Sequence, residues 1–279
     1  MRSHWITGGG RIQLHVVEAG NERGRPILFI HGFSQCWLTW IRQLNSDLVA
    51  DFRLVAVDLR GLGVSDKPRD GYADSRLWAD DIAAVIQTLH LDSPILCSWS
   101  YGLVPLDYIR HYGDDRIGGI QLVGAITKLG SDDAMSVLTP ETLAAAPGLF
   151  ATDAEESVRN LEAFIRMFFF RQPSAADLYT MLGYNVSVPP YVRQALFSRV
   201  IDNDDLLPKI RKPVLITHGA ADAVVKSSIV DRHGAAIAHA QIHTMANAGH
   251  APFFDDAAAF NQRLRAFAEG VSRPAHELA

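Results

Sequence analysis

Short apolar runs alternate with longer amphipathic segments along much of this chain, and this alternation restricts the folds that it can adopt. The apolar runs have the length of buried strands, and the segments between them repeat apolar residues at helical spacing. We expect strands over 26–30, 53–58 and 94–97, with helices over 37–50 and 73–91. Strands joined by helices form parallel pairs with right-handed crossovers, so the sequence predicts an α/β protein.

The same alternation continues toward the end of the chain. Further helices are predicted over 101–111, 226–237 and 256–270, and further strands over 117–126, 213–217 and 240–245. Near the start, a strand predicted over 11–19 is separated from the strand at 26–30 only by the turn-rich segment 20–24. We expect these two strands to form a hairpin.

Residues 127–210 carry several short helical patterns and no clear strand pattern. We expect them to form a helical cap inserted into a core domain made of residues 1–126 and 211–279. The cap contains the apolar run MFFF at 167–170. Aromatic residues at helical spacing are typical of helix packing, and lining a pocket is the alternative for some of them.

Composition narrows the range of partners. The 279 residues are 48% hydrophobic and 20% charged, which is typical of a globular protein with a sizeable core. A net charge of -5 gives no electrostatic reason to bind nucleic acid. The N-terminus lacks the apolar core of a secretory signal, and no segment approaches the roughly 20 apolar residues of a membrane span. We therefore expect a cytoplasmic protein with no membrane partner.

The cysteines and histidines outside the main motifs do not indicate a metal site. Cys36 and Cys97 lie in or next to apolar stretches and form no CxxC pair, so we interpret both as core residues. His239 and His243 fall across the boundary of a predicted strand and lack the helical context of a metal site. We expect no metal and no cofactor.

The strongest chemical signal is the segment SWSYG at 98–102, which joins a predicted strand to a predicted helix. A nucleophile elbow needs small residues two positions before and after its serine, because the strand and helix crowd a strained turn. Ser98 and Gly102 occupy those positions around Ser100, with Ser98 replacing the first glycine of the GxSxG pattern. These residues indicate a nucleophile at Ser100; on the motif alone, an ordinary turn serine is the alternative.

An acid and a histidine follow Ser100 in the order that such a site requires. Asp222 lies just beyond the strand predicted at 213–217, and His250 follows the strand at 240–245. His250 can accept the serine proton, while Asp222 orients the other ring nitrogen and stabilises the imidazolium. Some related sites take the acid from an earlier loop, but residues 124–130 contain no carboxylate. We therefore predict Ser100, His250 and Asp222 as the catalytic residues.

An oxyanion hole needs two backbone N–H groups aimed at the developing negative charge. The residue after the nucleophile supplies one, which makes Tyr101 the first candidate. The second comes from the loop after an earlier strand, where Gly32 and Phe33 follow the strand at 26–30. Gly32 allows a close backbone approach, so we predict the Phe33 N–H as the second donor.

Together these segments resemble the α/β-hydrolase superfamily, in particular its serine esterase and cofactor-free haloperoxidase-like branch. The matching segments are HGF at 31–33, DLRGLGVS at 58–65, SWSYG at 98–102, HGAAD at 218–222 and AGHAPF at 248–253. The resemblance implies a mostly parallel eight-stranded sheet flanked by helices, with an inserted helical lid. It also implies that Asp58 belongs to a structural turn and takes no part in catalysis.

The expected reaction is hydrolysis of a small apolar carboxylic ester or lactone through an acyl-enzyme on Ser100. Aromatic residues near the predicted mouth are the candidates for substrate binding, and the sequence leaves open whether the chain forms a homo-oligomer. The candidates beyond the oxyanion residues are Trp37, Trp99, Phe168 and Phe253.

Two other activities remain open for the same residues. One is perhydrolysis, in which hydrogen peroxide replaces water; haloperoxidase-like relatives often carry proline after the oxyanion residue, where this chain has Ser34. The other is a ligand receptor with very slow turnover. Dehalogenases and epoxide hydrolases are disfavoured because they place an aspartate where Ser100 stands. Meta-cleavage hydrolases and hydroxynitrile lyases keep the serine, so the triad does not exclude them.

Overall fold

The computed structural model describes residues 1–272. Within that range one eight-stranded sheet has the strand order β1-β2-β4-β3-β5-β6-β9-β10, and every pair from β4 to β10 is parallel. Strands β1 and β2 add antiparallel pairs at one edge, so the predicted mostly parallel eight-stranded sheet is confirmed. The strands are β1 (Arg2–Thr7), β2 (Gln13–Gly20), β3 (Arg25–Ile30), β4 (Phe52–Val57), β5 (Ile95–Trp99), β6 (Gly119–Val123), β9 (Val214–Gly219) and β10 (Gln241–Met245).

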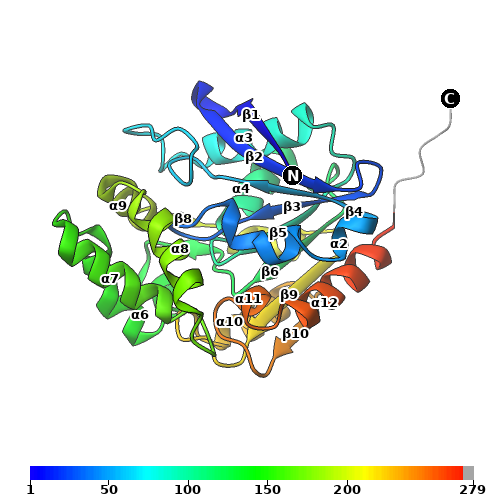
Figure 1. Cartoon of the computed structure of the whole chain (residues 1–279). Coiled ribbons are helices and arrows are strands. Elements are labelled where there is room, and N and C mark those ends of the chain that lie inside the picture. The colour runs from blue at the N-terminus through cyan, green and yellow to red at the C-terminus, as the bar shows by residue number, and fades with distance from the viewer. Residues whose placement is uncertain (273–279) are drawn as a thin grey trace.

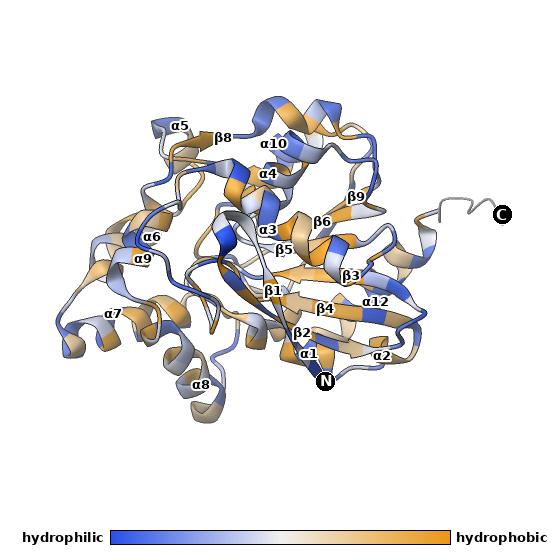
Figure 2. Cartoon of the chain, turned by 90° about the horizontal axis from the view of Figure 1, so that it is seen from above, coloured by the Kyte–Doolittle hydropathy of each residue, from blue (hydrophilic) through white to orange (hydrophobic). Residues whose placement is uncertain are grey.

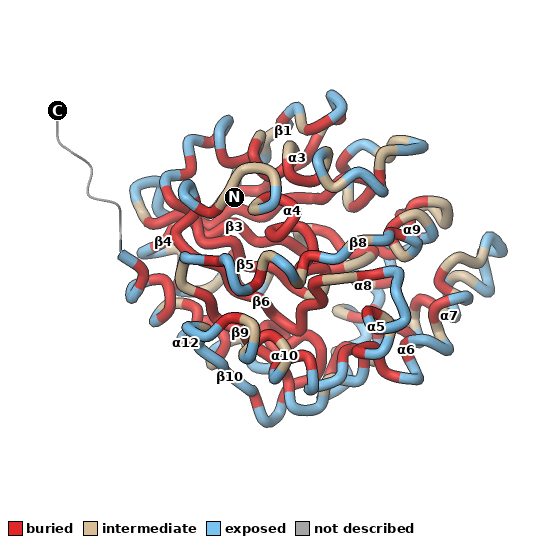
Figure 3. Tube along the Cα trace, turned by 180° about the vertical axis from the view of Figure 1, so that it is seen from behind, coloured by how far each residue is buried: buried red, intermediate tan, exposed pale blue. Residues whose placement is uncertain are grey.

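Helices cover both faces of this sheet, as Figure 2 shows from above. Helix α3 (Ser75–Thr88) packs against α4 (Leu103–Tyr112) on one side, and α1 (Ile41–Leu44) meets α11 (Pro252–Asp255) and α12 (Ala257–Gly270) on the other. The remaining helices of the core are α2 (Leu48–Asp51) and α10 (Ser228–Ala236). The central strands are buried on both faces, which explains their continuous apolar runs (Figure 3).

The predicted hairpin between the first two strand patterns is wrong. Strand β2 pairs with β1 and β4, whereas β3 pairs with β4 and β5, so β4 lies between β2 and β3. Gly20 lies opposite Arg53 and Arg25 lies opposite Phe52, so residues 21–24 pass over the start of β4. Four residues reach roughly 13 Å when extended, enough to cross the roughly 10 Å of two strand spacings.

The helix predicted over 37–50 is divided into a 3-10 turn at Trp37–Trp40 and the short helices α1 and α2. The hydroxyl of Ser46 donates to the carbonyl oxygen of Gln43 and accepts from the N–H of Leu48. A serine side chain that bonds to the backbone in this way competes with the helical hydrogen bonds and ends the first segment.

Between β6 and β9 the chain leaves the sheet. The short strands β7 (Lys128–Leu129) and β8 (Ile201–Asp202) pair with each other at the two ends of this segment. Its helices gather on one side of the molecule, drawn mostly in green in Figure 1. They are α5 (Asp132–Met135), α6 (Pro140–Ala145), α7 (Ala154–Arg166), α8 (Ala175–Val186) and α9 (Pro190–Phe197).

The described residues end within the second part of the predicted core domain. The last seven residues of the predicted core range 211–279, namely 273–279, lie outside the described residues. Among residues 1–272, no helix has both the length and the apolar character needed to cross a membrane.

Candidate active site

Ser100 occupies a strained turn directly after β5. Its φ is 60°, a left-handed value that is uncommon for a residue with a side chain. The turn is held by the loop after β6: the N–H of Ser100 donates to the carbonyl oxygen of Val123 at 2.8 Å, and Ile126 donates back to the carbonyl oxygen of Ser100 at 2.8 Å. Surrounding backbone therefore maintains the strained conformation, as expected of an elbow.

The residues on either side of this turn show how closely it is packed. A Cβ added to Gly102 would lie 2.8 Å from the Cβ of Ala125 and 2.9 Å from the carbonyl oxygen of Ile126, so only glycine fits there. Ser98 is fully buried, and its hydroxyl donates to the carbonyl oxygen of Tyr101 at 3.4 Å. The serine that replaces the first glycine of the pattern is thus accommodated.

The structure brings the three predicted catalytic side chains into one hydrogen-bonded row. Ser100 Oγ lies 2.9 Å from His250 Nε2, and His250 Nδ1 lies 2.8 Å from Asp222 Oδ2. These residues follow β5, β10 and β9, which are parallel strands whose carboxyl ends meet at one edge of the sheet. The side chains of His250 and Asp222 are 1% exposed, so the row is shielded from solvent.

The surroundings of Asp222 stabilise its charged form. Burial acts to raise the pKa of this carboxyl, but the adjacent His250 and the hydrogen bonds to it hold the pKa below its usual value. Its other oxygen accepts the N–H groups of Val224 at 2.8 Å and Val225 at 2.9 Å. An ionised Asp222 accepts a hydrogen bond from the Nδ1–H of His250, which leaves Nε2 without a proton and able to accept that of Ser100.

Aromatic side chains surround His250. The Trp99 indole donates to the carbonyl oxygen of His250 at 2.7 Å, and its ring centroid lies 5.4 Å from the imidazole. Phe168 packs edge-on against Trp99 at 5.4 Å and lies 5.8 Å from the imidazole. Phe253 contacts the other rings of the core, including Trp40 at 4.4 Å. These rings therefore hold His250 in place.

The backbone N–H groups of the two predicted oxyanion residues, Phe33 and Tyr101, differ in whether they already have a hydrogen-bond acceptor. Within residues 1–272 the N–H of Phe33 has no protein acceptor. The close approach of this loop is visible at Gly32, where an added Cβ would lie 3.0 Å from the Cβ of Ser100. The N–H of Tyr101 contacts the carbonyl oxygen of Trp99 at 2.6 Å across the strained turn, so a substrate oxygen would share this donor.

A small apolar cavity opens next to Ser100, with a free volume of about 50 Å³. Besides Ser100, two residues that line the cavity carry a hydroxyl group, and both hydroxyls are already hydrogen-bonded. The hydroxyl of Tyr101 donates to the carbonyl oxygen of Leu196, and that of Thr142 donates to the carbonyl oxygen of Val224. The lining residues are Phe33, Ser100, Tyr101, Ile126, Leu129, Leu138, Thr142, Leu149, Phe164, Phe197 and Val224.

The four aromatic residues predicted to bind substrate lie elsewhere. Trp99, Phe168 and Phe253 pack behind His250, as described above. Trp99 is the last residue of β5, and its ring is directed toward His250. Trp37 is half-buried beside His15, with ring centroids 6.4 Å apart. The lining residues contributed by 127–210 belong to no recognisable motif, so sequence reasoning did not identify them.

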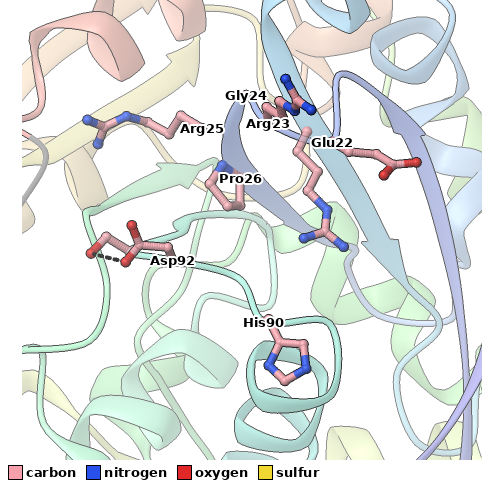
Figure 4. Close-up of a pocket in the computed structure, with 9 residues that line it drawn as sticks. Glu22, Arg23, Gly24, Arg25, Pro26, His90 and Asp92 are labelled. Carbon is pink, nitrogen blue, oxygen red and sulfur yellow. Dashed lines mark hydrogen bonds between the residues drawn. The ribbon is translucent and has the colours of Figure 1, made fainter. Parts of the chain in front are cut away.

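A second hollow lies at the opposite end of the strands (Figure 4). It is lined by the starts of β3 and β5, where Arg25 and Pro26 begin one strand and Ser93 precedes the other. The side chains that line it are mainly polar and charged, including Arg23, His90 and Asp92. Ser100 follows the carboxyl end of β5, so this hollow is separate from the row of Ser100, His250 and Asp222.

Comparison with known proteins places this geometry in a family. The model of the alpha/beta hydrolase family matches residues 27–263. The chain is similar to the crystal structure of an esterase from Rhodococcus sp. ECU1013, with 35% identity, a TM-score of 0.92 and coverage of 98% of this chain and 100% of that one.

Two further matches extend this comparison. An AB hydrolase superfamily protein of Bacillus subtilis (strain 168) is 28% identical over 269 residues, which are 95% of this chain and 98% of that protein. Bromoperoxidase from Bacillus anthracis shares the fold, with 23% identity, a TM-score of 0.85 and coverage of 96% and 100%. The chain therefore belongs to the alpha/beta hydrolase family.

Proposed function

We propose that this protein is a serine hydrolase that cleaves small apolar carboxylic esters or lactones through an acyl-enzyme on Ser100. The observation that carries the proposal is the row of hydrogen bonds from Ser100 through His250 to Asp222, at 2.9 and 2.8 Å. The 35% identity to an esterase over nearly the whole chain supports it.

In the proposed mechanism, His250 Nε2 accepts the proton of Ser100 as Oγ attacks the carbonyl carbon. The negative charge that develops on the carbonyl oxygen is stabilised by the N–H groups of Phe33 and Tyr101. His250 then protonates the departing alkoxide, which leaves as an alcohol. A water that gives its proton to His250 attacks the acyl-enzyme and releases the acid, and Asp222 stabilises the imidazolium in both steps.

The cavity supports a small, apolar acyl group. Its free volume of about 50 Å³ corresponds to roughly four water molecules, and its walls are aliphatic and aromatic apart from hydroxyls that are already bonded. A short acyl chain fits this space, whereas a long chain requires the walls to move.

We also propose that residues 127–210 act as a cap over this cavity. Six of the lining side chains come from this segment, whereas Phe33 and Ser100 come from loops of the core. The six are Leu129, Leu138, Thr142, Leu149, Phe164 and Phe197. The acyl-binding walls are therefore shared between the two parts, and changes in the cap are expected to alter chain-length preference more than the chemistry.

Ser34 favours hydrolysis over perhydrolysis. Its φ is 60°, and a proline ring fixes φ near −65°, so the proline that haloperoxidase-like relatives often carry at this place would not fit the loop as it stands. The backbone that follows Phe33 is thus arranged differently from one that contains proline.

A substrate panel tests the proposal. We expect 4-nitrophenyl acetate and butyrate to be hydrolysed with sustained turnover, at a kcat/KM at least tenfold above that of the octanoate, and small lactones to be opened. Ser100→Ala should remove this activity. A single turnover per molecule would instead favour a receptor with very slow turnover. Absence of hydrolysis across the panel, or unchanged hydrolysis by Ser100→Ala, would refute the proposal.

A further inference from the structure

A second serine, histidine and aspartate form a hydrogen-bonded row at the edge of the sheet. Ser3 Oγ lies 3.2 Å from His15 Nε2, and His15 Nδ1 lies 2.9 Å from Asp58 Oδ2. Ser3 belongs to β1, His15 to β2, and Asp58 directly follows β4. Strands β4 and β3 separate β2 from β5, which leads to Ser100, so the two rows are distinct.

The hydrogen bonds of this row run in the same direction as those of Ser100, His250 and Asp222. Asp58 is fully buried and accepts the N–H groups of Trp37 at 2.7 Å and Val64 at 3.1 Å as well as His15. With Nδ1–H of His15 donating to the Asp58 carboxylate, as in the pair of His250 and Asp222, Nε2 of His15 is placed to accept a hydrogen bond from the hydroxyl of Ser3. Asp222 has the same support from two backbone N–H groups and one histidine.

Solvent access distinguishes the second row from the first. Ser3 is exposed, the His15 side chain is 10% exposed and Asp58 is 0% exposed, so the row runs from the surface into the core. Trp5, two residues further along β1, lies on the same face as Ser3 and directly opposite His15. Its ring is 5.3 Å from the imidazole and the residue is 58% exposed, which provides an aromatic surface beside the hydroxyl.

We propose that Ser3 is a second acyl acceptor, which takes an acyl group from activated aryl esters and retains it. Ser3 Oγ attacks the carbonyl carbon while its proton passes to His15 Nε2. The bond between that carbon and the aryl oxygen then breaks, and the proton moves from His15 to the leaving oxygen. The products are a phenol and an acyl ester on Ser3, and the aryl ring is bound against Trp5.

This site is slower than Ser100. Ser3 lies in an extended strand, away from the elbow and from the Phe33 loop that faces Ser100. Loss of one oxyanion donor typically lowers a rate by about 100-fold or more, so we expect acylation of Ser3 to be at least that much slower than acylation of Ser100.

The test uses the full-length Ser100→Ala protein, so that turnover at the first site does not consume the reagent. The protein is incubated with 4-nitrophenyl acetate, quenched and digested with pepsin at low pH, where serine esters persist and acyl transfer to amines is suppressed. Tandem mass spectrometry then follows acetylation of Ser3 and, as an internal reference, of Ser227. Ser227 is exposed at the start of α10 and makes no capping hydrogen bond.

We expect Ser3 to be acetylated at least tenfold faster than Ser227, and His15→Gln to reduce Ser3 to the rate of Ser227. Equal rates at the two serines, or an unchanged Ser3 rate in a folded His15→Gln protein, would overturn the proposal. The comparison between the two serines decides the matter even if His15→Gln fails to fold. Because Ser100 is absent throughout, the result is independent of the proposed esterase activity.

Discussion

The indole N–H of Trp99 donates a 2.7 Å hydrogen bond to the backbone carbonyl oxygen of His250. The residue that precedes Ser100 therefore holds the backbone of the histidine that faces it. Both residues are buried, so this carbonyl has no access to bulk water if the indole is lost. This contact joins the end of β5 to the loop after β10, and so helps to position the base relative to the nucleophile.

Trp99→Phe should lower kcat by about tenfold with little change in KM. Phenylalanine retains ring packing against Phe168 but leaves the His250 carbonyl unpaired, which typically costs about 1–3 kcal/mol. Steady-state kinetics and thermal unfolding measure the two effects. Trp78→Phe is the matched control, because its buried indole donates at 2.8 Å to Tyr72, outside the His250 loop. It should lose similar stability and keep its kcat within about twofold; equal kcat losses in both variants would contradict this account.

Substitution of the two small residues around Ser100 should have very different effects: little change at Ser98, and a loss of stability and activity at Gly102. Ser98→Gly removes only a 3.4 Å contact with Tyr101 and should change activity by less than about threefold. Gly102→Ala forces a Cβ to within 2.8 Å of Ala125 and should destabilise the protein by about 1–3 kcal/mol while reducing kcat. Urea unfolding and ester hydrolysis distinguish these outcomes, and a fully active, stable Gly102→Ala protein would show that the elbow relaxes.

Asp255 connects the His250 loop to the segment that follows α7. Its carboxylate accepts the N–H of Gly249 at 2.8 Å and that of Phe170 at 3.0 Å. Both N–H groups donate to the same oxygen, Oδ2, and Asp255→Ala removes it, so we expect kcat to fall several-fold and hydrogen exchange at 167–171 to accelerate. Asp256→Ala is the control, because the neighbouring Asp256 only caps α12 by accepting the N–H of Ala259. If exchange at 167–171 is unchanged in Asp255→Ala, Asp255 does not couple the two segments.

Protonation of His233 should weaken the fold in mild acid. Burial lowers the pKa of His233 from 6.5 to about 4, and its Nε2 is paired with Thr127 at 3.1 Å. The unfolded chain therefore binds this proton at a higher pH than the folded chain. The stabilising contribution is complete above pH 6.5 and is lost as the pH falls from 6.5 to 4, by an amount on the order of 3 kcal/mol.

Comparison with His233→Gln isolates this effect. Burial raises the pKa of Asp81 from 3.8 to about 6, so that group acts with the opposite sign over the same range, but equally in both proteins. Chemical unfolding at pH 7 and pH 5 should show a smaller loss of stability in His233→Gln than in the native sequence. Identical losses would indicate that His233 is protonated in the folded protein at pH 5.

The parts of this molecule that sequence reasoning predicted are those fixed by local rules. Ser100, Asp222 and His250 each follow an apolar strand pattern, and the carboxyl ends of parallel strands must meet at one edge of the sheet. The hairpin between β2 and β3 was predicted wrongly because sequence distance does not reveal that β4 is inserted between them. Strand β1 was not predicted, since Ile6 is the one buried residue among its six and the strand carries almost no apolar pattern.

The cavity walls required the three-dimensional structure. Leu138, Leu149 and Phe197 are far apart along the 127–210 segment, and only their packing over Ser100 brings them together. The aromatic residues expected around the mouth, namely Trp37, Trp99, Phe168 and Phe253, do not line this cavity. Trp99 is next to Ser100 in the chain, but its ring packs against His250 and does not line the cavity.

The most direct test of the central claim is active-site labelling with a fluorophosphonate, followed by intact mass measurement and peptide mapping. The account predicts rapid incorporation of one phosphonyl group per molecule at Ser100, with complete loss of ester hydrolysis, and at least a hundredfold slower labelling in His250→Ala. Rapid stoichiometric labelling at a residue other than Ser100, or full hydrolytic activity after Ser100 has been labelled, would contradict it.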